Sequence, residues 1–264
     1  MNDSELQNLA HEYRKELFEK FVEVGQGHPG STFSMVEIAT TLYHGGYVRP
    51  EFDKVLISKG HATVTLYPIL TKLGIIPQKE WDNWGSTKSC LRVFGNISIP
   101  GIDVTSGSLG HGIGVGLGMS FASKNREYWT KNVYVVISEG ELYEGSTWEA
   151  LLFASHHKPK NLTIFIDIYN LIILGETKDC VSLEPIKDKL EGFGFDIYDV
   201  DGHDVSQLRN ALDKKSETTK VILSRTVKGK GFSLMENKPN WHYMNKMSEE
   251  EIEQCRKEIN NVSA

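Results

Sequence analysis

The middle of this chain alternates between short apolar runs and one amphipathic segment. Residues 133–137 and 162–166 are apolar, rich in β-branched side chains and bounded by polar residues, which is typical of buried strands. Between them, apolar positions from about 146 to 156 recur with a helical period. This order of strand, helix and strand predicts a βαβ unit with two parallel strands.

Similar patterns continue on both sides of this unit. Strands are predicted at 55–57, 195–200 and 221–224, and helices near 4–22, 34–44, 62–73, 77–84, 205–212 and 248–259, with a glycine-rich helix beginning within 105–120. Residues 85–106 have no regular period and predict a long loop. Helices that alternate with strands predict an α/β fold with a doubly wound, mainly parallel sheet flanked by helices. A chain of 264 residues suits a single domain over 1–264.

Composition narrows the functional classes. A net charge of −6 argues against a nucleic-acid partner, for which a basic face is expected. The three widely spaced cysteines, Cys90, Cys180 and Cys255, form no CxxC pair and suggest reduced thiols in a cytoplasmic protein. The N-terminus has no apolar signal core, and no run of about 18 apolar residues exists, so no membrane span is expected.

Acidic and polar residues follow both central strands. Glu139 comes just after the first strand, and residues 167–171 follow the second. The carboxyl ends of parallel strands lie at one edge of the sheet, where ligands of such folds bind. Oxygen ligands from two adjacent strand ends, beside the start of a helix, suit a hard cation and a phosphate group. We therefore expect a cation and phosphate site at this edge.

The familiar nucleotide motifs are absent. The glycine-rich run 107–118 contains no GxGxxG and follows a loop rather than an apolar strand, which disfavours a dinucleotide-binding oxidoreductase. The chain also lacks GxxxxGK[ST] and HExxH. Gly110, Gly114 and Gly118 lie on one helix face, each at a cost of roughly 1 kcal/mol relative to alanine. Another helix or a ligand is therefore expected to approach that backbone closely.

Five motifs follow one another along the chain: GHPGS at 27–31, SKGHA at 58–62, TSGSLGHG at 105–112, EGELYEGSTWEA at 139–150 and TVKGKGFSLMEN at 226–237. Together they resemble the N-terminal, pyrophosphate-binding half of transketolase. The chain is similar above all to the short subunit of split transketolases, whose partner chain carries the pyrimidine-binding and C-terminal domains. The resemblance covers nearly the whole chain.

The resemblance implies an enzyme that uses thiamine diphosphate to transfer a two-carbon ketol unit between sugars or related carbonyl compounds. In that family the cofactor lies between two chains: one binds the diphosphate through a divalent cation, and the other holds the aminopyrimidine. The chain is therefore expected to be active only with its C-terminal partner subunit, in a heterotetramer of two short and two long chains.

The resemblance also implies roles for single residues. His28 would face the reacting carbon and handle protons on substrate hydroxyls, and His61 would be the second catalytic histidine. Glu144 and Glu149 match carboxylates near the subunit interface that are thought to connect the paired active sites. The residues expected to bind the cofactor are His61, Gly107, Leu109, Gly140, Glu141 and His242.

Simpler interpretations stay open for several of these residues. His28 and His61 each follow a glycine and could merely cap a turn. His242 is followed by Tyr243, where the family usually has glycine. Glu149 could be a solvated carboxylate on a helix.

The predicted cation site departs from the family pattern. The family has Gly-Asp-Gly and, thirty residues past the aspartate, an asparagine, whereas this chain has Ser-Glu-Gly at 138–140 and Tyr169 at the second position. The remaining candidate ligands are Glu139, the Leu171 carbonyl and Asn170, which can serve only if the backbone shifts by one residue. Because glutamate adds a methylene, Ca²⁺ with its longer, looser bonds would tolerate it better than Mg²⁺.

Two functional hypotheses follow. Retention of His28, His61 and the glycine-rich helix favours a thiamine-diphosphate enzyme subunit with altered metal coordination and an unusual ketol donor or acceptor. Loss of both metal side chains favours an inactive transketolase-like scaffold or regulatory subunit. The family's Gly-His-Pro, which helps to recognise the sugar, is replaced within residues 91–96, so a standard phosphosugar pocket is doubtful. Arg92 in this loop could bind an anion or be solvated.

Overall fold

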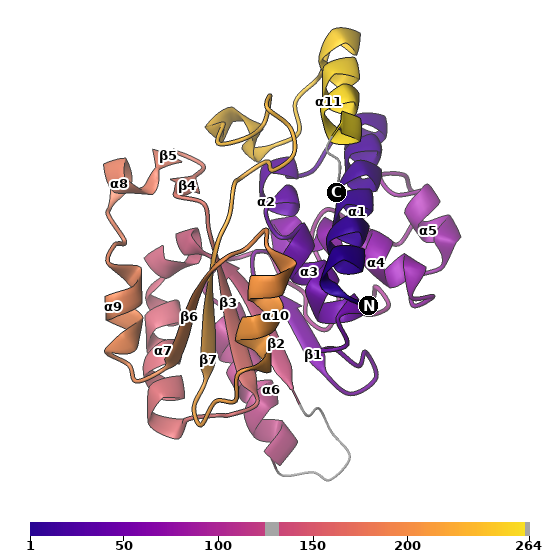
Figure 1. Cartoon of the computed structure of the whole chain (residues 1–264). Coiled ribbons are helices and arrows are strands. Elements are labelled where there is room, and N and C mark those ends of the chain that lie inside the picture. The colour runs from indigo at the N-terminus through magenta and orange to yellow at the C-terminus, as the bar shows by residue number, and fades with distance from the viewer. Residues whose placement is uncertain (125–131, 262–264) are drawn as a thin grey trace.

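The computed structural model describes residues 1–124 and 132–261 (Figure 1). These residues form a main sheet of five parallel strands in the order β1-β2-β3-β7-β6. The predicted βαβ unit lies at its centre, because β2 and β3 pair in parallel with Val133 opposite Leu162. The strands are β1 (Lys54–Ile57), β2 (Val133–Ser138), β3 (Leu162–Ile168), β6 (Asp196–Asp201) and β7 (Lys220–Arg225).

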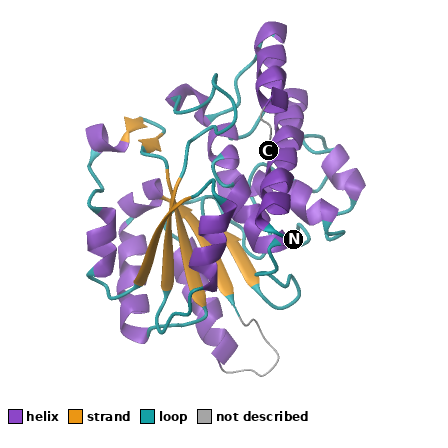
Figure 2. Ribbon diagram, in the orientation of Figure 1, coloured by secondary structure: helices purple, strands orange, loops and turns teal. Residues whose placement is uncertain are grey.

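Helices cover both faces of the sheet (Figures 1 and 2). Alternation along β2 places Tyr134 and Val136 in one apolar core, and Val133, Val135 and Ile137 in the other. Burial on both faces explains why the central strands are apolar runs. The prediction of a doubly wound α/β fold is therefore confirmed. The first core includes side chains of α1 (Asp3–Val24), α3 (Val36–His44), α4 (Leu66–Lys72) and α10 (Val205–Asp213), and the second includes those of α6 (Gly112–Lys124), α7 (Gly145–His157) and α9 (Ile186–Glu191).

The other described helices lie in the connections and at the C-terminal end. They are α2 (Pro29–Phe33), α5 (Gln78–Asp82), α8 (Thr177–Cys180), α11 (Glu249–Asn261) and three 3₁₀ helices, η1 (Gly60–Thr65), η2 (Glu139–Tyr143) and η3 (Pro239–His242). Within residues 1–124 and 132–261, no helix combines the length and apolarity that crossing a membrane requires.

Local structure departs from the sequence prediction at three places. The helix expected at 34–44 is preceded by α2, which begins at Pro29 because proline suits the first turn of a helix. The glycine-rich helix begins only after Gly110, whose φ of +87° lies outside the right-handed helical region. A hairpin of β4 (Leu171–Ile172) and β5 (Gly175–Glu176) follows β3. Strands of two residues are too short to produce a periodic pattern.

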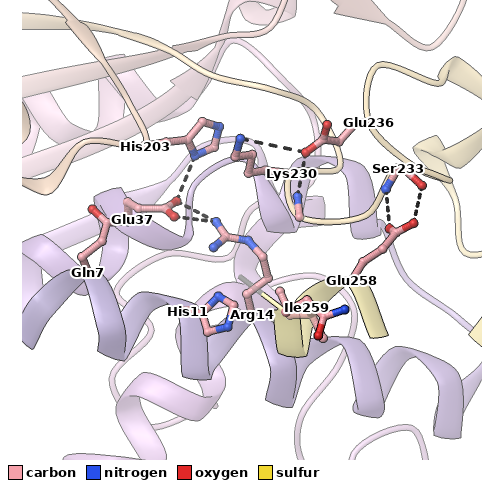
Figure 3. A pocket seen from close by; sticks show the side chains of 12 residues that line it. Gln7, His11, Arg14, Glu37, His203, Lys230, Ser233, Glu236, Glu258 and Ile259 are labelled. Carbon is pink, nitrogen blue, oxygen red and sulfur yellow. Dashed lines mark hydrogen bonds and ion pairs between the residues drawn. The ribbon is translucent and has the colours of Figure 1, made fainter. Parts of the chain in front are cut away.

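A buried ion pair joins α1 to α3 (Figure 3). Arg14 of α1 donates to both carboxylate oxygens of Glu37 on α3 at 2.7 Å, and His203 Nδ1 lies 3.0 Å from Glu37 Oε2. The other ring nitrogen of His203 accepts a hydrogen bond from the Val227 amide at 2.9 Å. Burial alone would raise the pKa of Glu37, but Arg14 and His203 bring that pKa down to about 2. These contacts hold the segment after β7 against α1 and α3.

Replacing Glu37 with glutamine is expected to destabilise the protein by about 3 kcal/mol at neutral pH, because the buried Arg14 loses its charged partner. The folded-state pKa of Glu37 lies below the ordinary value, so its contribution is complete above pH 4.5 and is lost as pH falls through about 2. Urea unfolding of both proteins at neutral and acidic pH measures this effect. The difference in unfolding free energy between them should shrink in acid.

The matched control is Glu19→Gln, which removes a half-exposed pair with Arg256. Its cost should be below about 1 kcal/mol. An unfolding difference between wild type and Glu37→Gln that is the same at every pH would contradict the assignment.

Candidate functional site

The carboxyl ends of the central strands meet at one edge of the sheet, as the sequence predicts. Ser138 at the end of β2 pairs with Asp167 of β3. Glu139 directly follows β2 and is buried. Its Oε1 accepts hydrogen bonds from the amides of Tyr169 at 2.9 Å and Leu171 at 3.1 Å. The acid after one strand and the segment after the next are therefore in direct contact.

A cavity of about 500 Å³ lies beside this edge, a volume typical of small-molecule sites. Three exposed apolar side chains form part of its wall. Ile173 and Leu174 lie in the turn between β4 and β5, and Val181 follows α8. Six predicted site residues also line it: His61, Leu109, Gly140, Glu144, Leu171 and His242.

The other predicted site residues do not line this cavity. Asn170 is exposed, with φ of +57°. Gly107 and Glu149 are also exposed, whereas Glu139 and Glu141 are buried. His28 is buried as well and adjoins two histidines of the cavity wall.

Three histidines from different segments form one cluster. The ring centroid of His28 lies 5.1 Å from that of His61 and 5.3 Å from that of His242. His61 Nε2 lies 3.1 Å from Ser31 Oγ. Burial, and next the charge of Lys228, lowers the pKa of His28 and of His242 to about 4, and burial holds the pKa of His61 well below 6.5. Near pH 7 the three rings are therefore neutral, so each has one donor and one acceptor nitrogen.

Two aromatic side chains flank His28. Its ring centroid lies 5.6 Å from that of Phe94 and 4.9 Å from that of Tyr243. Phe94 belongs to the 91–96 loop. In the same loop, Arg92 Nη1 donates to two carbonyls of its own loop at 2.6 Å and 2.8 Å. Part of this guanidinium is therefore already occupied.

Glu141 anchors the glycine-rich segment. Its carboxylate contacts Ser58 Oγ and accepts a hydrogen bond from the Gly110 amide at 3.0 Å. Burial raises the pKa of Glu141 to about 7. A Cβ on Gly110 would lie 2.6 Å from Ser146 Oγ, so both this contact and the positive φ require glycine there. The cofactor role predicted for residue 141 concerns its backbone amide and stays a prediction.

Two buried lysines, which sequence reasoning missed, lie next to the histidines. Lys59 forms a fully buried ion pair with Asp167. Lys228 is 1% exposed and lines the cavity, with Nζ donating to His242 Nδ1 at 3.2 Å and lying 5.1 Å from the Tyr169 ring centroid. Burial, and next the charge of Lys59, lowers the pKa of Lys228 to about 8, so its ammonium is mostly charged at pH 7. Only their places within the SKGHA and TVKGKG motifs could have indicated these lysines.

The described residues do not present a ready set of ligands for a divalent cation. Of the predicted ligands, Glu139 is buried whereas the Asn170 side chain is exposed and does not line the cavity. One oxygen of Glu139 is engaged by two amides, and burial raises the pKa of Glu139 to about 7. Tyr169 is buried, which raises its pKa above 10 and keeps the phenol a neutral, poor ligand. Cation binding by Glu139, Asn170 and Leu171 stays a prediction. The donor atoms that these residues present fit a divalent cation poorly.

Comparisons with known proteins agree with this geometry. Residues 7–261 match the family model of the transketolase thiamine diphosphate binding domain, and the chain belongs to this family. It is 35% identical over 242 residues to an apulose-4-phosphate transketolase subunit from Phocaeicola vulgatus, covering 87% of this chain and 85% of the relative. It is 32% identical over 259 residues to the 6-deoxy-6-sulfo-D-fructose transketolase subunit SqwG of Clostridium sp. (strain MSTE9), covering 93% of each.

The crystal structure of transketolase from Campylobacter jejuni has the same fold. It matches with a TM-score of 0.89 and 26% identity, covering all of this chain but 44% of that one. The chain thus spans most of its subunit relatives and less than half of that longer transketolase. The resemblance to the N-terminal subunit of split transketolases is confirmed, because the relatives of matching length are named as transketolase subunits.

Replacing Lys228 with methionine is expected to raise the pKa of His28 and His242 from about 4 toward 6.5 without reaching it. Removal of the ammonium relieves one cause of the shift, but burial, the larger cause, remains. NMR titration of the histidine ring resonances measures this change. Lys238→Met, which alters an exposed lysine of the following segment, is the control and should leave both pKa values unchanged. Identical titration curves in wild type and Lys228→Met would contradict this electrostatic account.

Proposed function

We propose that this chain is the diphosphate-binding subunit of a split, transketolase-like transferase. With its partner it moves a two-carbon ketol unit between sugars or related carbonyl compounds, using thiamine diphosphate. The observation that carries the proposal is the neutral cluster of His28, His61 and His242 beside a cavity at the carboxyl ends of the central strands. The names of the relatives, which are single subunits, support a division of the active site between two chains. Residues 1–264 then form one pyrophosphate-binding domain.

The cavity suits the diphosphate end of this cofactor. Lys228 supplies a positive charge, and His61 and His242 supply ring nitrogens. The backbone of Gly140 forms part of the wall, where an added Cβ would lie 3.3 Å from Ile172 Cγ2. The residues proposed to bind thiamine diphosphate are His61, Gly107, Leu109, Gly140, Glu141 and His242.

The cofactor, when bound, supplies the carbanion chemistry of ketol transfer. This chain orients it and handles protons. His28 Nδ1 is buried and has no hydrogen-bond partner among the described residues. Because Nδ1 is closed to solvent, a substrate hydroxyl that enters beside Phe94 would use the other ring nitrogen, and a neutral imidazole can take the hydroxyl proton and return it. His61 is held by Ser31 and is proposed to act as the second catalytic histidine.

The partner subunit is proposed to cover α6 and α7. Gly114 and Gly118 on α6 are exposed, and a Cβ at either position would meet nothing within 4 Å. The sequence predicts a close neighbour at all three glycines. Within this chain Gly110 has one, but Gly114 and Gly118 do not. On α7, Leu152 is 65% exposed and Phe153 is 51% exposed. Apolar and backbone surface of this kind suits a tightly packed helix from another chain.

Two acidic residues lie at the same surface. Glu144 precedes α7 and lines the cavity, and Glu149 is exposed on α7. We assign both to the subunit interface, where they would link the paired active sites of a cytoplasmic heterotetramer.

The alternative function is an inactive scaffold or regulatory subunit, which the poor cation ligand set favours. The histidine cluster and the charged, cavity-lining Lys228 favour the enzyme.

Replacing His28 with alanine is expected to lower the rate of ketol transfer about 10²- to 10⁴-fold, because the proton-handling group is lost. Thiamine diphosphate affinity should change little, since His28 does not line the diphosphate cavity. Steady-state kinetics and cofactor titration with the partner subunit present measure the two effects. His11→Ala on α1, outside this cavity, is the control and should keep the wild-type rate. A His28→Ala enzyme with the wild-type rate would rule out the proposed role.

Replacing Leu152 with aspartate is expected to prevent assembly with the partner, because the exposed leucine would be replaced by a charge that the interface must bury. Native mass spectrometry measures the assembly, and circular dichroism checks that the fold of the variant is intact. Leu73→Asp changes another exposed leucine, at the end of α4, and should leave assembly unchanged. Normal assembly of Leu152→Asp would place the partner elsewhere.

A further inference from the structure

A bound diphosphate brings several negative charges into a largely buried site. Charges removed from water require compensating charges and hydrogen bonds. A divalent cation is the expected source, but Tyr169, whose buried phenol stays neutral, occupies the position where the family resemblance places an asparagine ligand. Another positive group that faces the cavity is therefore needed.

One carboxylate oxygen of Glu139 is turned toward backbone amides. The amides of Tyr169 and Leu171 both donate to its Oε1. An oxygen that accepts two hydrogen bonds has its lone pairs occupied. The Tyr169 ring is buried in the wall of the same cavity, where the family's asparagine would provide an oxygen. Glu139 thus has only its second oxygen left for a cation, and Tyr169 offers only a neutral phenol.

Lys228 is the positive group that faces the cavity. It is 1% exposed, and no described carboxylate lies within ion-pair distance of its ammonium, which donates to the neutral ring of His242. Lys59, the other buried lysine nearby, differs because its ammonium is already paired with Asp167. Burial lowers the pKa of Lys228, and the carboxylates of Glu139 and Asp167 oppose this shift only from beyond ion-pair distance. The buried ammonium therefore lacks a direct counterion, and an entering anion would reduce this penalty.

The Lys228 side chain is held in place before any ligand arrives. The Gly229 amide donates to the Gly30 carbonyl at 2.9 Å, and the Asn237 amide donates to the Lys228 carbonyl at 2.9 Å. A Cβ on Gly30 would lie 3.0 Å from Lys228 Cγ, so glycine at position 30 leaves room for the lysine stem. A group that is positioned in advance loses little entropy when it binds.

We infer that this chain binds diphosphate without a divalent cation, with the Lys228 ammonium beside His242 taking the place of the ion. The inference rests on the proposed function, because it concerns the same cofactor site. It departs from the metal-bridged binding that the family resemblance implies. It also explains how the cofactor can be retained although Glu139 and Tyr169 replace the family's ligands.

The test uses the full chain after dialysis against EDTA, with inorganic diphosphate as the probe in calorimetric titrations. We expect binding in EDTA, with an affinity that added Mg²⁺ changes by less than about 3-fold. Lys228→Met should weaken binding by about 10- to 100-fold, the loss of one hydrogen-bonded charge. The control Lys238→Met should bind like wild type. Thermal unfolding checks that Lys228→Met, which removes a buried charge, is folded.

A second variant tests the inference from the opposite direction. Glu139→Asp combined with Tyr169→Asn restores the family's ligand types at both positions. This double variant should acquire a Mg²⁺ dependence of at least about 10-fold, whereas wild type shows none. A double variant that binds equally well with and without Mg²⁺ would count against the inferred role of these two positions.

The outcomes separate the inference from the proposed function. Binding to wild type only with Mg²⁺ overturns the inference and leaves the proposed function in place. Binding that survives Lys228→Met unchanged also overturns it. An absence of diphosphate binding under either condition overturns the inference as well. If thiamine diphosphate then fails to bind to the assembled subunits with or without Mg²⁺, the proposed function fails with it.

Discussion

The fully buried ion pair between Lys59 and Asp167 connects the segments that build the site. Asp167 also accepts hydrogen bonds from Ser34 at 2.5 Å and from Thr226. Four segments therefore meet at one carboxylate: the start of η1, the end of α2, β3, and the chain after β7. Removal of one partner from such a pair costs about 3–5 kcal/mol, because an uncompensated buried charge remains. The segments that carry His28 and His61 cannot separate without incurring that cost.

The arrangement of buried charge around this pair makes the cavity a place for an anion. Glu139 is engaged by amides of the segment after β3, and Glu141 by the amide of Gly110. The histidines of the cluster are neutral near pH 7 because burial disfavours their charged forms. Lys228 remains as a charged side chain in the cavity wall without an acidic partner among the described residues. A positive group in a low-dielectric wall attracts a negative ligand strongly.

How well the sequence predicts secondary structure depends on how the element is buried. The runs at 133–137 and 162–166 correspond to β2 and β3 within two residues at each end, because two-sided burial makes every position of such strands apolar. The predicted starts of helices agree less well with the structure. The first helix of the GHPGS motif was missed because a turn of five residues has no period to detect, although Pro29 is a known start signal.

The sequence by itself determined the fold class and the family, because hydrophobic periodicity and five ordered motifs are properties of the chain read in order. It also identified the strand ends where the site lies. Only the tertiary structure decided how Glu139, Tyr169 and Lys228 are arranged, because each takes its contacts from segments distant in sequence. Burial and hydrogen-bond partners set the charge and orientation of a side chain, and neither can be read from neighbouring residues alone.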